Sequence, residues 1–255
     1  MDHSPLHTRL KHLNCLSEED LSLLTNLFEK THLYSANDSI LAEGATLDKA
    51  EVITDGWALR YKTLADGRRQ ILNFLLPGDV YGVFCPLFEE AEYGVEALTR
   101  VTSYSFKAIK ILETFAECPQ LWLALCWLAG VDERQLDEQI MRVGKRNAAE
   151  RMAHLFLELR KRQLRSGIKK PQAQQLPISQ SILADALGMS HVHTNRSFGR
   201  LVRNGMVKLN NREISLVDID ALKTLAQFDG GYLLDTEVPE DTKNAINTLR
   251  DSNET

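Results

Sequence analysis

Hydrophobic and polar positions alternate in short runs through the first hundred residues of this chain. Alternation with a period of two places one face of a strand in a core, and Asp-Gly and Pro-Gly-Asp groups between the runs favour tight turns. After a helix expected over 17–28, the pattern therefore predicts a small antiparallel β-barrel or jelly roll. The runs lie at 51–54, 57–61, 70–76 and 100–106, with turns at 55–56, 66–67 and 77–79.

From Cys118 onward the hydrophobic spacing changes to three and four residues, the period of a helix. Only Gly130 and Gly144 interrupt the chain before Arg165, so we expect a long helix and a second one over 148–164. A narrow apolar seam is typical of helix-to-helix dimerisation, although Glu133 departs from it; the alternative is that this face packs on the barrel. The predicted seam is Trp122, Cys126, Ala129, Leu136, Ile140 and Val143.

After a polar loop expected over 166–175, residues 177–203 predict two short helices joined by a tight turn. Ser179 and Ser190 each precede a helix, and a Ser hydroxyl accepts hydrogen bonds from the free N–H groups of a first turn. Gly188 between them can adopt the positive φ that such a turn requires. The spacing is that of a helix-turn-helix, which usually contacts two DNA half-sites as a dimer.

The second of these helices has two different faces. Thr194, Phe198 and Leu201 form an inner stripe at helical spacing. On the outer stripe, Asn matches adenine edges, Arg matches guanine edges and Val meets a thymine methyl group, while Arg200 and Arg203 are placed to neutralise phosphates. The alternative is an ordinary helical hairpin with a solvated polar face. The predicted base-contacting residues are His191, Val192, Asn195 and Arg196.

A β-hairpin is predicted directly after the second helix. Asn204-Gly205 is a typical helix stop. The runs 206–209 and 213–216 then flank 210–212, where two Asn residues tolerate the positive φ of a tight turn. A hairpin in this position makes the unit a winged helix.

Charge is distributed unevenly along the chain. The whole chain holds 30 Lys and Arg against 35 Asp and Glu, whereas residues 146–228 hold 14 basic and 6 acidic groups. Residues 1–145 have a net charge of −8 and residues 229–255 a net charge of −5. A basic segment inside an acidic protein indicates a polyanionic partner for that segment alone.

Length and composition indicate a protein with two domains and real cores. The chain has 255 residues, of which 44% are hydrophobic and 25% are charged. The longest apolar run, 121–129, is too short to span a membrane, and the first residues lack the features of a signal peptide. We expect a cytoplasmic protein that does not bind membranes. The expected domains are 1–117 (helix and barrel), 118–146 (dimerisation helix), 147–228 (winged helix) and 229–255 (acidic tail).

Four cysteines are scattered without a C-x-x-C pair, which argues against a disulfide framework. Cys118 and Cys126 lie in apolar surroundings and are predicted to be buried. An N-terminal group has metal-capable side chains, but its irregular spacing is unlike that of known zinc sites, so no metal is predicted. That group is His3, His7, His12 and Cys15; the fourth cysteine is Cys85.

Over residues 15–225 the chain resembles the Crp/Fnr family of bacterial transcription regulators. Residues 74–82 (FLLPGDVYG) are similar to the family's barrel segment, and 176–196 are similar to its DNA-binding signature. The runs 192–196 and 225–233 look like a branch found in alphaproteobacteria. The resemblance implies a homodimer that binds a palindromic promoter site and contacts RNA polymerase. It places Ser179, Ser181, Ser190 and His193 at phosphate contacts, and His191, Val192 and Arg196 at base contacts.

The chain departs from the family's cyclic-nucleotide members in the segment 82–95. Val83 stands where they have a ribose-binding Glu, and Tyr93-Gly94 stand where they have a phosphate-binding Arg-Ser pair. No Lys or Arg lies between Arg69 and Arg100, so a phosphate would lack its countercharge. Cyclic AMP bound in the usual way is not expected, the effector is left open, and Cys15 alone does not provide the four cysteines of an iron–sulfur cluster.

Two other kinds of function make different demands on the sequence. Cupin-like barrel enzymes bind a catalytic metal through His and carboxylate ligands, but no His lies between His32 and His154, so we expect no enzyme. The second alternative is a protein-docking module with little DNA binding, against which the basic segment 146–228 argues.

Thr194 and Ser197 are less apolar than the residues that the family usually has at these inner positions, and a slightly looser helix is expected there.

Overall fold

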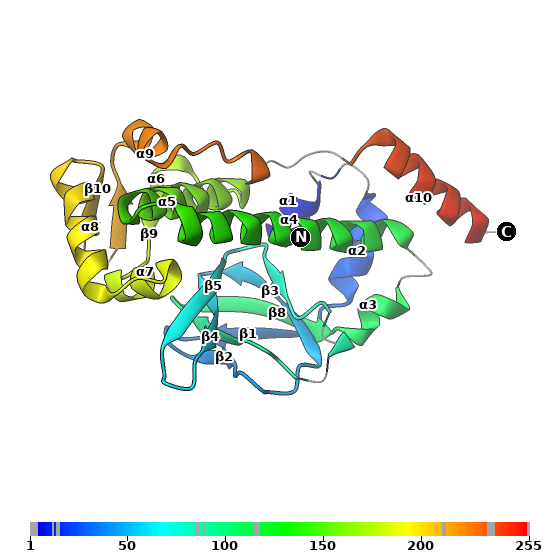
Figure 1. Ribbon diagram of the computed structural model, residues 1–255. Helices are drawn as coiled ribbons and strands as arrows, with labels where there is room; N and C mark the ends of the chain where they lie inside the picture. Colours follow the sequence, from blue (N-terminus) through cyan, green and yellow to red (C-terminus); the bar gives the residue numbers. More distant parts are fainter. Residues whose placement is uncertain are drawn as a thin grey trace.

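The computed structural model describes residues 5–11, 13, 16–84, 87–88, 90–114, 118–210, 213–233 and 238–253. A β-barrel lies against a long central helix, and a second domain of helices with a small sheet lies at one end of that helix (Figure 1). This is the α+β architecture that the hydrophobic pattern predicted. No helix in the described part is long and apolar enough to cross a membrane.

Two antiparallel four-stranded sheets form the barrel, in the orders β1-β8-β3-β6 and β2-β7-β4-β5. Its interior is filled by side chains from both sheets, among them Ile53, Leu75, Val95 and Val101. The jelly-roll prediction is confirmed. The strands are β1 Lys30–Tyr34, β2 Ser39–Leu41, β3 Lys49–Asp55, β4 Ala58–Thr63, β5 Arg69–Leu75, β6 Val80–Tyr81, β7 Gly94–Ala97 and β8 Val101–Lys107.

The four predicted strands correspond to β3, β4, β5 and β8, and the other four strands were not predicted. β1 and β2 contain no buried residue, so their side chains alternate too weakly to mark a strand. The turn at 55–56 was predicted correctly. Gly56 has a φ of +81°, and a β-carbon there would come within 1.9 Å of the Arg100 carbonyl oxygen, so only glycine fits.

Three helices flank the barrel: α1 Pro5–Lys11, α2 Glu18–Asn26 and α3 Ile109–Glu113. The predicted helix over 17–28 is α2, and Ser17 and Asp20 form a reciprocal capping box at its start. Leu10, Leu21 and Leu24 pack against the long helix in one core cluster.

The long helix α4 spans Pro119–Lys145 and the next helix, α5, spans Ala148–Arg165. Arg146 is extended, and Asn147 caps α5 in a box with Glu150, so the chain breaks between the helices as predicted. Cys118 is buried, but the prediction that Cys126 is buried is wrong, because that thiol lies on the exposed side of α4.

The C-terminal domain is a winged helix. α7 (Gln180–Leu187) and α8 (His191–Arg203) precede the hairpin of β10 (Val207–Asn210) and β11 (Glu213–Leu216). The loop predicted over 166–175 is partly wrong, because α6 (Lys170–Ala173) forms there and β9 (Gln175–Leu176) pairs with β11. The remaining elements are α9 Ile219–Ala226, the short 3₁₀ helix η2 Gly231–Leu233, and α10 Glu240–Asn253, which packs on α4.

The barrel and the winged helix share one hydrophobic core. Trp57, Leu59 and Phe74 of the barrel belong to the same buried cluster as Phe156 and Phe198 of the C-terminal domain. Polar contacts accompany this packing: the Gln70 side chain donates to the Ala186 carbonyl at 3.3 Å, and Arg69 pairs with Asp185 at 3.3 Å. The first helix of the helix-turn-helix is therefore fixed to strand β5.

Candidate DNA-binding surface and barrel cavity

Side-chain caps fix the two helices of the helix-turn-helix. The Ser179 hydroxyl accepts from the Ile182 N–H, and the Ser190 hydroxyl accepts from the His193 N–H, each at 3.3 Å. Gly188 between them has a φ of +61°. These are the capping and turn positions that the sequence predicted. Because Ser190 caps α8, the outer side chains of that helix are not needed as caps.

The inner face of α8 is fully covered. Thr194, Phe198 and Leu201 are buried, as predicted, and Ser197 is buried beside them. The Ser197 hydroxyl accepts a hydrogen bond from Arg200 at 3.3 Å. Within the described residues the buried Thr194 hydroxyl has no hydrogen-bond partner, which is a cost to stability.

The outer face of α8, defined as His191, Val192, Asn195 and Arg196, is exposed along its whole length. Val192 is 79% exposed, a high value for a large apolar side chain. In the part of the chain that the structure describes, no side-chain hydrogen bond or ion pair involves His191, Asn195 or Arg196. The structure thus places all four predicted base-contacting residues on one accessible surface.

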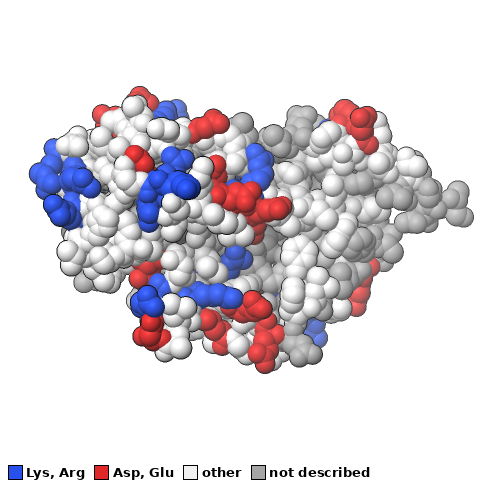
Figure 2. All heavy atoms as spheres, viewed as in Figure 1, with Lys and Arg blue, Asp and Glu red and all other residues white. Residues whose placement is uncertain are grey.

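The predicted phosphate-contacting residues surround that face. The Ser179 and Ser181 hydroxyls lie 2.8 Å apart at the start of α7, and Ser190 and His193 are exposed at the start of α8. Arg200 and Arg203 are exposed in its last turns. Lys and Arg side chains gather at the end of the molecule that α8 and β10 form (Figure 2).

The predicted dimer seam is not buried at any position. Trp122 packs beside the core under α2, and Ala129 lines a cavity of the barrel. Further along α4, Leu136 is 41% exposed and Ile140 is 71% exposed. The seam therefore divides into a first half turned partly toward this chain's own core and a second half open to solvent. The full set is Trp122, Cys126, Ala129, Leu136, Ile140 and Val143.

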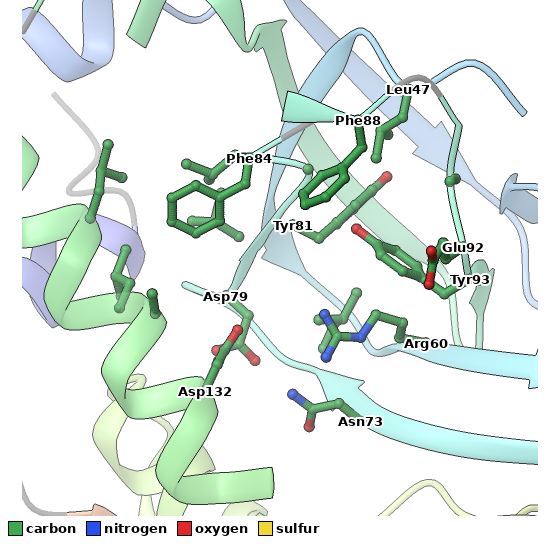
Figure 3. Close-up of a pocket in the computed structure, with 18 of the residues that line it drawn as sticks. Leu47, Arg60, Asn73, Asp79, Tyr81, Phe84, Phe88, Glu92, Tyr93 and Asp132 are labelled. Atoms are coloured by element: carbon green, nitrogen blue, oxygen red, sulfur yellow. The ribbon is translucent and has the colours of Figure 1, made fainter. Parts of the chain in front are cut away.

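A cavity of about 350 Å³ lies between the barrel and α4 (Figure 3). Phe84, Phe88 and Tyr81 lie on one side of it, and Arg60 and Asn73 lie on the other. Asp79 and Asp132 lie near each other between these two sides, where α4 passes the barrel. Leu125, Leu128 and Ala129 of α4 complete the wall.

Asp79 is the centre of a buried charge cluster at the edge of this cavity. Its carboxylate accepts from Arg162 of α5 at 2.6 Å and pairs with Arg9 of α1. Burial alone would raise the pKa of Asp79, but the two guanidiniums outweigh burial and hold that pKa below its usual value. Arg162 also donates to the Phe74 carbonyl at 2.7 Å and to Asn73 at 2.9 Å.

Arg60 and Asp132 line the cavity but were not predicted as site residues. Arg60 comes from β4, where the guanidinium carbon lies 5.1 Å from the centre of the Tyr93 ring, and Asp132 comes from α4. Burial, followed by the negative charge of Asp79, raises the pKa of Asp132. The expectation that no cation faces this site was therefore wrong, because it considered only the segment between Arg69 and Arg100; no local signal in the sequence marks Arg60.

His7 is the one member of the N-terminal metal-capable group that lies within the described residues. His7 is hydrogen-bonded to the Leu21 carbonyl at 3.1 Å and to the Thr25 hydroxyl at 2.9 Å. No metal-type cluster of three or more His, Cys, Asp or Glu occurs among the described residues. His3, His12, Cys15 and Cys85 lie outside them.

Two family models match the two halves of the chain. Residues 31–118 match the cyclic nucleotide-binding domain, and residues 150–225 match the Crp-like helix-turn-helix domain. The first range covers the barrel and the second covers α7, α8 and the wing.

Curated relatives and a solved structure agree with these models. The chain is 29% identical over 212 residues to the nitrogen fixation regulation protein FixK of Bradyrhizobium diazoefficiens, covering 83% of this chain and 87% of the relative. It is 25% identical to the transcriptional activator protein FnrL of Cereibacter sphaeroides, covering 89% and 92%. The structure of FixK2 from Bradyrhizobium japonicum has a TM-score of 0.68 and 25% identity, covering 77% of this chain and 96% of that one.

Proposed function

Because this chain belongs to the Crp/Fnr family of transcription regulators, we propose that it acts as a homodimer on palindromic promoter sites. The family consists of regulators, so the chain is a DNA-binding regulator of this type and not an enzyme. We infer from the site which groups of DNA it contacts, in which oligomeric state it acts and which effector it responds to.

The observation that carries the proposal is the exposed outer face of α8. Its polar groups have no partner within the described residues, while the opposite face is buried in the core. Such a helix fits the major groove, where Arg196 pairs with a guanine edge, Asn195 with an adenine edge, and Val192 with a thymine methyl group. His191 at the first position of the helix contacts a neighbouring base.

The surrounding hydroxyls and guanidiniums contact phosphates and so fix the helix in the groove. Because these contacts are independent of sequence, they contribute to affinity on any DNA. They are Ser179, Ser181, Ser190, His193, Arg200 and Arg203.

Dimerisation follows from the exposed second half of the α4 seam. Leu136 and Ile140 leave apolar surface in water that a second copy of α4 would cover. Pairing of two α4 helices presents two α8 helices to half-sites one DNA turn apart. We further propose that the bound dimer contacts RNA polymerase, since a relative is named a transcriptional activator; addition of the protein would then raise the transcript yield from its own site in a purified polymerase reaction.

The test compares two arginines on DNA of two kinds. An inverted repeat is first selected from random DNA by the purified protein, and affinities for this repeat and for random DNA are measured by fluorescence anisotropy. Arg196→Ala should weaken binding to the repeat by about 1–3 kcal/mol per half-site and leave random DNA nearly unchanged. Arg203→Ala should weaken both about equally and lower the salt dependence.

The control variant is Arg68→Ala, which removes an exposed arginine on the barrel hairpin that pairs with Asp66. It should change neither affinity. Equal losses for Arg196→Ala on both DNAs would contradict the base-contacting role. If the wild-type protein shows no salt-dependent binding to any DNA, the chain is instead a protein-docking module, and the DNA-binding proposal is wrong.

A further inference from the structure

The cavity between the barrel and α4 has a composition that points to one class of ligand. Its volume of about 350 Å³ is that of a small-molecule site. The wall is largely apolar and aromatic, with a few polar groups on one side (Figure 3). This composition suits a compact molecule with an apolar body and one polar end.

A cyclic nucleotide, which the matched domain model implies, does not fit these residues. At the position of the family's phosphate-binding serine, a β-carbon built on Gly94 would lie 2.4 Å from the ring of Tyr61. The Tyr61 ring therefore occupies the space that the serine hydroxyl would need. Val83 lines the cavity and offers no acceptor for a ribose hydroxyl.

One cation in the cavity is not neutralised. Arg9 pairs with Asp79, and Lys62, on the same strand as Arg60, pairs with Glu92 at 3.1 Å. Among the described lining residues, Arg60 is the cation that has no ion pair within 4 Å; it stacks on Tyr93, and its charge also acts on the Asp132 carboxyl. Its Nε atom is buried and without a hydrogen-bond partner in the described part of the chain. The Arg60 side chain is half-buried, and leaving its buried Nε without a partner is costly; an anionic ligand group would satisfy it.

The side of the cavity facing α4 limits what that anion can be. Burial and the charge of Asp79 raise the pKa of Asp132, so this carboxyl more readily holds a proton with which to donate a hydrogen bond to an acceptor. Leu125 and Leu128 of α4 line the same cavity as Phe84 and Phe88. A flat carboxylate matches the planar fork of Arg60 in a bidentate pair, and the hydrocarbon walls match an apolar body.

We propose that this cavity binds a compact organic acid, in which a single carboxylate pairs with Arg60 and an aromatic or branched apolar body lies among Phe84, Phe88 and the leucines of α4. Because the same wall includes Asp79, which holds Arg162 of the C-terminal domain, the ligand lies beside the contact between the two domains. The ligand is thus a candidate effector for the DNA-binding end.

The experiment is calorimetric titration of the full-length protein without DNA, so its outcome is independent of the proposed promoter binding. The probes are benzoate, phenylacetate, 3-phenylpropionate and 4-methylpentanoate, with benzamide and phenylacetamide as uncharged analogues, and cyclic AMP and cyclic GMP as comparators. At least one acid should bind saturably at one site per chain. Its amide should bind at least about tenfold more weakly, because it loses the charge-assisted pair with Arg60.

The variants assign the site. Arg60→Gln should weaken the best acid at least about tenfold, and Arg60→Lys should give an intermediate value because it keeps the charge without the fork. Arg68→Gln, a charge removal on the β4–β5 hairpin outside the cavity, should leave affinity unchanged. Thermal unfolding checks that each variant folds, and the acid–amide comparison on the wild type stands even where one does not.

Three results would overturn the proposal. The first is saturable binding of a cyclic nucleotide that is tighter than that of any acid. The second is the absence of saturable binding for every acid up to about 1 mM, the range of weak specific ligands. The third is an unchanged affinity of the best acid for folded Arg60→Gln.

Discussion

The outer face of α8 and the barrel cavity both carry charged groups, and they differ in how those charges are satisfied. On α8, His191, Asn195 and Arg196 are exposed and have no partner among the described residues. At the cavity, Asp79 of the turn before β6 pairs with the guanidiniums of α1 and α5. The outer face of α8 is therefore open in this structure, whereas a change at Asp79 would affect the contact between the domains.

The largest expected effect comes from breaking that contact. Arg162→Met removes a buried guanidinium, 6% exposed, from Asp79. Removal of one partner of a buried pair leaves an uncompensated charge, so we expect the free energy of unfolding in urea to fall by about 3 kcal/mol. The loss should be moderate for this class of change because Arg9 still faces Asp79.

Two further variants make this result specific. Lys170→Met changes the same type of charge at an exposed position of the same domain and should shift stability by less than about 0.5 kcal/mol. The double variant Asp79→Leu/Arg162→Met should recover part of the loss, since no charge is then left unpaired. If Arg162→Met and Lys170→Met unfold alike, Arg162 does not hold the two domains together.

A smaller effect is expected where α4 connects the two surfaces. Ile140 is 71% exposed on the seam, and burial of such a side chain in each copy stabilises a dimer by about 2 kcal/mol. Ile140→Glu should therefore raise the dimer dissociation constant at least about tenfold in analytical ultracentrifugation. Binding to the inverted repeat should weaken, while binding to an isolated half-site should not.

Leu33→Glu is the matched control for the seam. Leu33 is 65% exposed on β1, away from α4, so the same change in polarity there should leave both the dimer and DNA binding intact. If Ile140→Glu remains a dimer of wild-type strength, the subunits associate through another surface. In that case the first half of the α4 seam only serves this chain's own core, as the packing of Trp122 suggests.

The difference between the two surfaces also explains what the sequence could predict. The features that define the helix-turn-helix lie in one short segment of the sequence. They are caps at Ser179 and Ser190, a positive-φ glycine at 188, and side chains at helical spacing. Local rules of capping and periodicity suffice to place such residues. Strands β3, β4, β5 and β8 were found for a similar reason, since each is a short run with buried residues next to turn residues.

Local sequence patterns do not predict the cavity, because its charged groups come from distant segments. Arg9, Arg60, Asp79 and Asp132 belong to α1, β4, the turn before β6, and α4. Only the packing of α1 and α4 on the barrel brings them together, and no spacing in the sequence records it. The absence of cations between Arg69 and Arg100 was a correct observation, but it did not describe the site. The burial prediction for Cys126 was wrong for a similar reason, because apolar neighbours along the chain did not show which side of α4 faces water.

The smallest expected effect concerns the inner face of α8, where the family's apolar pattern is broken. The Thr194 hydroxyl is buried and has no hydrogen-bond partner among the described residues. Thr194→Val has nearly the same shape and removes this unsatisfied group, so it should stabilise the protein by about 1 kcal/mol in urea unfolding. Neither the outer face nor DNA affinity should change.

Ser197→Ala is the control that separates a lost hydroxyl from a lost hydrogen bond. Ser197 is equally buried, but its hydroxyl accepts from Arg200, so its removal should be neutral or destabilising. The two variants together test whether the polar inner face loosens α8, as the sequence suggested. If Thr194→Val slows amide exchange along α8 while Ser197→Ala does not, the helix is loosened at one hydroxyl, because only Thr194 bears an unmet hydrogen-bonding need. If Thr194→Val instead destabilises the protein, the Thr194 hydroxyl has a hydrogen-bond partner in solution. In that case the polar inner face does not loosen α8.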